Sequence, residues 1–377
     1  MLLVAEPMLG EEEKAALAAV IDDGWITMGD RVRAFEKAFA DAHGLPDAVA
    51  VSSCTAGLHL LLAALDPAPG DEVLVPAMTF VATANAVLHA GATPVFVDIE
   101  GLDEPLMSLS DAAAKCTPRT RAVILVHYAG YLPDRDRWRD FARARGLVLI
   151  EDAAHAAGAA GAGSVGDAAA FSFYGNKNMT TAEGGMVVAR DPTLLERVRR
   201  LRAHGMTSDA RQRLSGHASG YDVTGLGFNC RMDDLRAAVG LVQLARLPGW
   251  NATREALSDA YRHHLARACP DVAVPFAAGR VSAHHILPVL LPRGADRPRL
   301  AESLRDAGVQ TSVHYAPVHH FTFYRERTPG VALPLTEEFA RRELTMPLHP
   351  KMTERDVTAV AEALARALAG QHQEAQP

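Results

Sequence analysis

The sequence predicts a large α/β domain built on a mostly parallel sheet, followed by a smaller α+β domain. Between residues 48 and 150, short buried runs rich in β-branched residues alternate with helical segments, which is typical of a parallel sheet covered on both faces. The chain has 377 residues, 49% of them hydrophobic and 22% charged, enough for two domains with sizeable cores. We place the boundary at Pro248 and Gly249, which gives domains 1–248 and 249–377.

The order of elements follows from periodicity, breakers and caps. Helices are expected at residues 11–22 and 32–42, with a loop between them. The alternation that follows places strands at 48–52, 72–75, 94–97, 122–126 and 147–150, and helices at 56–65, 80–90 and 135–145. Residues 168–189 read as strand, loop and strand, with a helix at 194–203 after them.

The C-terminal part begins after an irregular, glycine-rich excursion at 204–227. A long helix at 233–247 is expected to end near Pro248. The small domain is predicted to contain strands at 285–291 and 309–313, a helix at 299–307 and two terminal helices, with residues 370–377 frayed.

Composition excludes several classes of protein. The net charge of −7 argues against a general nucleic-acid binder, for which a basic patch is expected. The four cysteines have no metal-ligand spacing and indicate free thiols in a reducing compartment. No apolar run approaches 18 residues, and no basic segment precedes an apolar core at the N-terminus. We therefore expect a soluble, cytoplasmic protein without a membrane partner.

Small hydroxyl residues follow the first predicted strand. Ser52, Ser53 and Thr55 precede or open a helix that continues through Ala56. Backbone N–H groups, short hydroxyls and the positive end of a helix dipole together favour phosphate binding. A simple helix cap is the alternative, although it needs only one of these residues.

Two further strand ends carry candidate binding groups, and ligands of such sheets lie at the carboxyl ends of the strands. Phe80 follows the second strand and either packs in the core or stacks on a flat ring. Glu151 and Asp152 follow the strand predicted at 147–150, and His155 comes three residues after Asp152. A carboxylate there can pair with a protonated pyridine nitrogen. A metal site made by Glu151, Asp152 and His155 is the competing interpretation.

Lys177 stands out because the chain has only five lysines and this one lies among Ser, Thr, Asn and Gly residues. A lysine amine can lose its proton when desolvated and then form a Schiff base with a carbonyl. A solvated loop lysine is the alternative. With a phosphate site, an aromatic platform and a ring-nitrogen carboxylate, the set indicates pyridoxal 5′-phosphate (PLP).

Two patterns suggest other sites but lack the necessary context. Gly161, Gly163 and Gly166 form a literal G-x-G-x-x-G, yet a strand rather than a helix is expected after it, so we interpret it as a turn. His319 and His320 resemble metal ligands, but no carboxylate or cysteine accompanies them at ligand spacing. We predict no metal.

Several motifs in the same order resemble the DegT-type (DnrJ/StrS-like) sugar aminotransferases, which are fold type I PLP enzymes. The motifs are Thr79-Phe80-Val-Ala-Thr-Ala-Asn85, Glu151-Asp152-Ala-Ala-His155 and Phe171-Ser-Phe-x-x-x-Lys177-x-x-Thr-x-x-Glu183-Gly-Gly. The resemblance covers nearly the whole chain, from the segment around Trp25 to His319. It implies a homodimer with shared active sites.

The resemblance also implies roles for single residues. Lys177 would be the Schiff-base lysine and proton shuttle, and Asp152 would pair with the ring nitrogen. His155 would lie near the ring oxygen, where many relatives have glutamine, and Phe80 would stack on the ring. Thr55, the Ala56 backbone and Ser172 would hold the phosphate. Asn229, or else Arg231, would reach the site from the other subunit.

By the same resemblance, glutamate or glutamine would donate the amino group in a ping-pong cycle, and a keto sugar or keto-cyclitol would accept it. An elimination or dehydration on the same fold and a non-catalytic PLP-binding regulator remain alternatives. Candidate substrate contacts come from the loops expected around the site, although each of them can also be purely structural: Trp25, Thr27, His127, Tyr128, His314, Tyr315 and His319.

Overall fold

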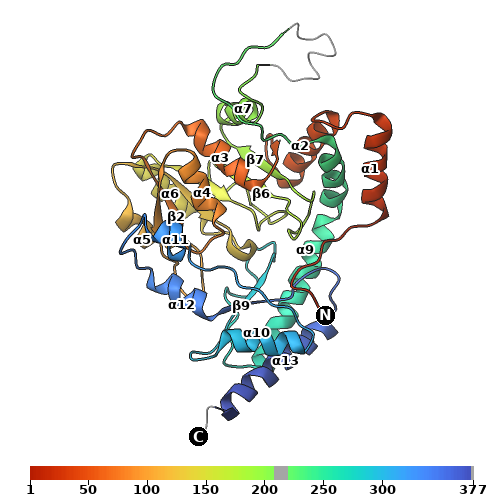
Figure 1. Ribbon diagram of the computed structural model, residues 1–377, viewed down its shortest axis with the longest axis vertical. Helices are drawn as coiled ribbons and strands as arrows, with labels where there is room; N and C mark the ends of the chain where they lie inside the picture. The colour runs from red at the N-terminus through yellow and green to blue at the C-terminus, as the bar shows by residue number, and fades with distance from the viewer. Residues whose placement is uncertain (208–219, 375–377) are drawn as a thin grey trace.

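The computed structural model describes residues 1–207 and 220–374, with side chains up to residue 371. A seven-stranded sheet lies at the centre of the larger part (Figure 1), with the strand order β1-β7-β6-β5-β4-β2-β3. The strands are β1 (Val49–Val51), β2 (Glu72–Pro76), β3 (Thr93–Val97), β4 (Thr120–Val126), β5 (Val148–Asp152), β6 (Ala168–Ser172) and β7 (Gly185–Ala189). All neighbours are parallel except β7, which is antiparallel to both β1 and β6. The predicted mostly parallel α/β sheet is confirmed.

Helices cover both faces of the sheet because its strands are apolar on both sides. Alternate strand residues such as Ile150 and Ala170 share one buried cluster with α3 (Cys54–Leu65), α4 (Ala82–His89) and α7 (Pro192–Leu201). Leu149 packs on the other face with α6 (Arg135–Arg145), and α2 (Asp30–His43) covers that face near β6 and β7. Successive residues of a strand point to opposite faces, so this pattern fixes where each strand-end side chain goes.

The C-terminal part is a smaller α+β unit. Its two-stranded antiparallel sheet joins β8 (Leu287–Leu290) and β9 (Glu343–Met346). Its core is shared by these strands with α10 (Arg297–Asp306) and α13 (Glu354–Glu374). The shorter elements of the described chain are α5 (Leu109–Lys115), η1 (Tyr128–Gly130), η2 (Val318–His320), α11 (Thr322–Arg325) and α12 (Pro334–Arg342).

Helix α9 (Asp234–Ala268) corrects one prediction, because it continues through Pro248 instead of ending there. Leu244 and Leu247 pack in the core of the large part, whereas Leu257 and Tyr261 pack in the core of the small part. The burial of both halves outweighs the hydrogen bond that a proline cannot donate. The helix therefore joins the two parts (Figure 1), and the boundary at 248/249 stays a prediction.

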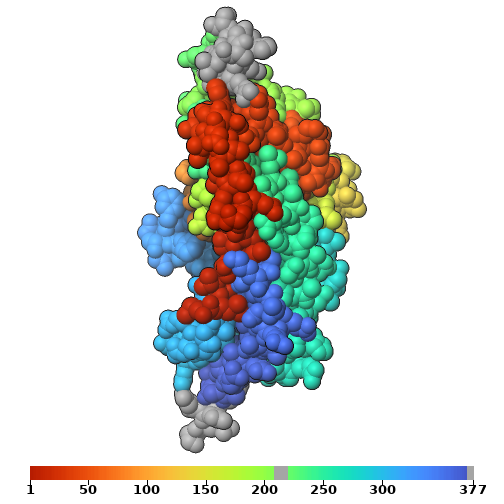
Figure 2. Space-filling view, turned by 90° about the vertical axis from the view of Figure 1, so that its right-hand side faces the viewer, coloured from red at the N-terminus to blue at the C-terminus, as the bar shows by residue number. Residues whose placement is uncertain are grey.

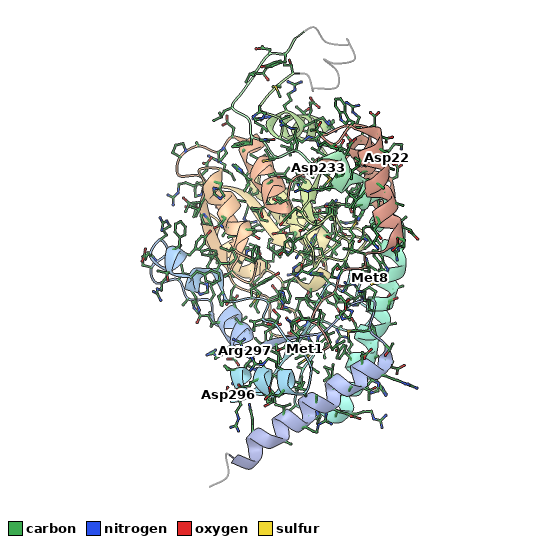
Figure 3. The ribbon with its side chains drawn as sticks, turned by 45° about the vertical axis from the view of Figure 1, so that its right-hand side comes forward. Met1, Met8, Asp22, Asp233, Asp296 and Arg297 are labelled. Carbon is green, nitrogen blue, oxygen red and sulfur yellow. The ribbon has the colours of Figure 1, made fainter. Side chains whose placement is uncertain are left out.

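The N-terminal segment lies along both parts (Figure 2). It enters α1 (Glu11–Asp23), which packs on α9. Met8 lies beside α9 (Figure 3), where its carbonyl accepts a hydrogen bond of 2.6 Å from Gln243. Closer to the N-terminus, Leu2 forms a β-bridge with Val309 in the small part.

Other differences concern short or terminal segments. The strand expected at 309–313 is only a pair of isolated bridges, and β9 and α5 were not predicted. The frayed end expected from residue 370 is wrong as far as residue 374, which is still helical; residues 375–377 lie outside the described chain. Half of the excursion expected at 204–227, residues 208–219, also lies outside it. Among the described residues, no helix has the length and apolar character to cross a lipid bilayer.

Candidate active site

A cavity of about 510 Å³ opens at the carboxyl ends of β5 and β6, beside the start of α3. Eight of the residues predicted for the site line it: Thr55, Phe80, Asp152, His155, Ser172, Lys177, His314 and Tyr315. Segments from both parts of the chain therefore meet at one sheet edge, as expected for ligand sites in parallel sheets.

Lys177 lies in the loop between β6 and β7, where its N–H closes a turn onto the Tyr174 carbonyl at 3.0 Å. Part of the residue is exposed, but its amine is buried within the site. Burial lowers the pKa of this amine to about 8, against the opposing attraction of Asp152. An appreciable fraction of the amine is consequently uncharged near neutral pH, as a nucleophilic lysine requires.

Asp152 ends β5 with its carboxylate at the cavity and is only 6% exposed. Oδ2 accepts a hydrogen bond of 2.6 Å from Thr83, whose hydroxyl lies 2.7 Å from that of Thr79. Oδ1 accepts from the Ala154 N–H at 3.2 Å and from the Cys54 thiol at 3.8 Å. Thr83 was not predicted as a site residue, because its contact with Asp152 joins residues 69 positions apart.

Glu151, the neighbouring carboxylate, points to the other face of the sheet. Its oxygens accept hydrogen bonds from the N–H groups of Gly163 and Gly166 at 2.9 and 2.8 Å, and His127 Nε2 lies 2.6 Å away. A Cβ on Gly166 would come within 2.4 Å of the Leu149 carbonyl, so the close approach requires glycine. The G-x-G-x-x-G turn thus binds an internal carboxylate. The metal site suggested for Glu151, Asp152 and His155 is not assembled, since adjacent strand residues point to opposite faces.

The start of α3 forms one wall of the cavity. Ser53 caps the helix, because its hydroxyl accepts a hydrogen bond of 3.1 Å from the Ala56 N–H. The Ala56 N–H, which we predicted to bind phosphate, therefore already has a hydrogen-bond partner in its own chain. Thr55 and Ser172 contribute hydroxyls to the lining. A Cβ on Gly185 would lie 2.7 Å from the Cys54 nitrogen, which shows how closely β7 approaches this helix start. Short hydroxyls around a helix N-terminus suit a bound phosphate.

His155 and Tyr315 meet on the other side of the cavity, with 2.9 Å between His155 Nε2 and the tyrosine hydroxyl. Burial lowers the pKa of His155 well below its usual range, and its Nδ1 has no hydrogen-bond partner within the described chain. His314 is held by the side chain of Thr345, 2.8 Å from its Nδ1. Burial lowers the pKa of His314 to about 4, so both imidazoles are neutral at pH 7.

The remaining predicted residues do not line the cavity. His127 is fully buried against Glu151, and the Tyr128 hydroxyl donates to the His314 carbonyl at 2.5 Å. Trp25 Nε1 donates to the Met28 carbonyl, and Thr27 is exposed.

Two residues that we expected from a second subunit form isolated β-bridges in their own chain: Asn229 with Ala203 and Arg231 with Val51.

His319 also lies outside the cavity, and here the structure corrects the sequence analysis. It brings Glu337 within 3.1 Å of His319 Nε2 and 3.6 Å of His320 Nε2, although no carboxylate stood near them in the sequence. A metal-binding histidine normally donates a hydrogen bond from the N–H of its second ring nitrogen to another group. His319 Nδ1 is buried and has no partner in the described part of the chain, so we interpret the trio as a hydrogen-bonded contact between η2 and α12.

The chain is similar to known proteins over almost its whole length. Residues 7–365 match the model of the DegT/DnrJ/EryC1/StrS aminotransferase family. The crystal structure of the aminotransferase TlmJ from Streptoalloteichus hindustanus is 35% identical, covers 99% of this chain and 100% of its own, and gives a TM-score of 0.90. DesV of S. venezuelae is 36% identical over 94% of each chain, with a TM-score of 0.86. DesI, solved in the presence of its TDP-sugar product, is 34% identical over 100% of this chain and 95% of its own, with a TM-score of 0.88.

Proposed function

Because the chain belongs to the DegT/DnrJ/EryC1/StrS aminotransferase family, whose members depend on PLP, we propose that it transfers an amino group from glutamate or glutamine to a keto sugar. We favour a nucleotide-linked keto sugar as the acceptor, and a keto-cyclitol is the alternative. The observation that carries this proposal is the Lys177 amine, with its pKa lowered to about 8, at the same cavity as the Asp152 carboxylate.

The residues at the cavity fit PLP. Lys177 supplies the amine that can react with the PLP aldehyde, and Asp152 can pair with the ring nitrogen. The Thr55 and Ser172 hydroxyls can donate hydrogen bonds to the phosphate. The Phe80 side chain lines the cavity and is 57% exposed, so it is available to stack on a ring. When bound, the cofactor takes up the amino group and stabilises negative charge on the carbon that loses a proton.

The protein's own part in this reaction is to place groups and hold protons. Lys177 Nζ can accept and return a proton because a pKa of about 8 lies close to neutral pH. The Thr79 and Thr83 hydroxyls form a chain that ends on Asp152 Oδ2 and orients this carboxylate. Neutral His155 and His314 offer polar atoms at the cavity wall without adding positive charge.

The sugar assignment rests on the family and on the relatives. The family acts in sugar and antibiotic biosynthesis, and the TDP-sugar product named for DesI supports a nucleotide-linked acceptor here. The cavity also has room and polar lining beyond the lysine, from Tyr174, Asn176 and Glu183. We further propose a cytoplasmic location, which the four unpaired cysteines support.

We also propose that two copies share their active sites, with Asn229, or else Arg231, completing the site of the partner. The exposed apolar side chains close to Asn229 in sequence support a contact surface: Leu226 is 88% and Tyr221 is 59% exposed. Mixing two inactive variants tests this. Lys177→Ala and Asn229→Ala protomers, refolded together, should regain up to about a quarter of the wild-type activity, because random pairing makes about half of the dimers heterodimers and half of the sites in each heterodimer are intact. No recovery, with heterodimers present, would contradict shared sites.

Half-reactions test the activity itself. Purified enzyme loaded with pyridoxamine phosphate is mixed with keto-sugar nucleotides and keto-cyclitols, and loss of the pyridoxamine phosphate absorbance is followed. We expect loss with at least one keto-sugar nucleotide in the wild type and none in Lys177→Ala. Product formation without amino transfer would favour elimination instead. Failure of the PLP form to react with any amino donor would favour a non-catalytic regulator.

A further inference from the structure

His285 lies next to the Lys177 amine, although it was not among the residues predicted for the site. Its Nε2 is 3.5 Å from Lys177 Nζ, and the residue is 4% exposed. It stands just before β8, so it reaches the site from the small part of the molecule. Its backbone is held on both sides, because its N–H donates to the Ala129 carbonyl and its carbonyl accepts from Arg254.

The tautomer of His285 follows from a chain of hydrogen bonds that ends on backbone carbonyls. Asn251 Nδ2 donates to the Ala157 carbonyl at 3.0 Å, so its Oδ1 is free to accept. Asn178 Nδ2 donates to that oxygen at 2.8 Å and to the Ala283 carbonyl at 2.6 Å. A carbonyl can only accept, so neither amide can be reversed without opposing two oxygens.

With both amides fixed in this way, Asn178 Oδ1 faces His285 Nδ1 at 2.8 Å and must accept from it. The proton of a neutral His285 is therefore on Nδ1, and Nε2 presents a lone pair to the lysine. Burial holds the pKa of His285 well below its usual range, with His155 and Lys177 adding to this effect, so the neutral ring prevails.

We propose that Asn178 and His285 form a positioning relay, in which His285 Nε2 accepts a hydrogen bond from the Lys177 amine and holds it at the cavity. The proposal rests on the role of Lys177 proposed above, and His285 acts only through that lysine. A neutral acceptor favours the charged amine over the uncharged one, so the relay also keeps the pKa of Lys177 from falling further. A donor or a cation at the same place would have the opposite effect.

The sign of this effect provides the test. Enzyme loaded with pyridoxamine phosphate leaves the Lys177 amine free, and its reaction with a small acylating reagent is measured against pH by mass spectrometry. We expect His285→Phe, which keeps a ring but removes the acceptor, to lower the apparent pKa of Lys177 by about one unit. His285→Gln can still present an oxygen and should stay close to the wild type, and Asn178→Ala should shift in the same direction as His285→Phe by less.

Other titrating and charged groups surround Lys177 and His285, and all variants keep them so that their effect on the pKa of Lys177 is the same: Asp152, Cys54, His155, His314, Tyr315 and Arg254. His349→Phe is the matched control, since His349 is equally buried and neither ring nitrogen has a partner among the described residues. This variant should leave the pKa of Lys177 unchanged.

An unchanged or raised pKa in His285→Phe would overturn the relay, as would a shift in His285→Gln equal to that in His285→Phe. If His285→Phe does not fold, the Gln and Asn178→Ala variants still decide, because the relay requires the first to match the wild type and the second to shift. The measurement needs no turnover. A wild-type protein that fails to transaminate would refute the proposed function and leave the titration of Lys177 interpretable.

Discussion

Glu151 and Asp152 are adjacent carboxylates at the end of β5, and they point to opposite faces of the sheet. Glu151 is fully enclosed, and two backbone N–H groups and His127 lie within 2.9 Å of its oxygens. Asp152 lies at the cavity, and one of its oxygens has only the longer contacts with Ala154 and Cys54. A carboxylate whose acceptor capacity is used inside the protein stabilises the fold, whereas one that retains capacity at a cavity can bind a ligand.

The same comparison applies to the histidines near them. His127 is fully buried beside Glu151, while His155, His285 and His314 lie on the Lys177 side. We therefore propose that the two faces of β5 separate a structural cluster from a functional one. Three substitutions test this separation.

The largest effect is expected for Asp152→Asn. Losing the negative charge beside the cofactor ring should slow the amino-transfer half-reaction by at least about 10²-fold. The fold should change little, because the amide oxygen can still accept from the Ala154 N–H while its NH2 group donates to the Thr83 hydroxyl, which can also accept. Stopped-flow absorbance and thermal unfolding measure the two quantities. A half-reaction at the wild-type rate would place the functional carboxylate elsewhere.

Glu151→Gln should have the reverse profile. Its amide would turn N–H groups toward the N–H of Gly163 or Gly166, which costs about 2–4 kcal/mol of unfolding free energy. The half-reaction rate of the folded variant should stay within a few-fold of wild type. Urea denaturation measures the loss, and Glu326→Gln on the exposed surface is the control. An unaffected stability combined with lost activity would reverse the roles of the two carboxylates.

Lys177→Met should abolish transamination and yet stabilise the cofactor-free protein. The pKa of this amine is about 8 in the folded state, below its usual value of 10.5, so the unfolded chain binds more protons between these values. Wild-type stability therefore rises as pH increases through this window. The variant should be more stable by about 2 kcal/mol at pH 7, and the difference should shrink between pH 8 and 10.

Urea denaturation at pH 7, 9 and 10 checks this expectation, and Lys37→Met is the control, because Lys37 is an exposed lysine paired with Asp41. A difference that grew with pH would show that burial does not lower the pKa of the Lys177 amine.

The sequence by itself determined the alternating α/β order, the strand ends and the local chemistry of the site. Asp152 and Thr55 could be chosen because a parallel sheet gathers the residues that follow its strands. Lys177 could be chosen because a lysine among small polar residues can be a nucleophile, and Ser172 was implied by the resemblance to the family. These features depend on short-range periodicity, capping and residue type, which are all readable along the chain.

Only the tertiary structure decided which of the chosen residues meet. Pro248 looked like a helix end, but packing in two separate cores carries α9 through it. His127 looked like a substrate contact and lies against Glu151, while Thr83 and His285 reach the site from positions 69 and 108 residues away from their partners. Hydrogen-bond partners, burial and the resulting pKa values depend on neighbours that the chain brings together only when it folds.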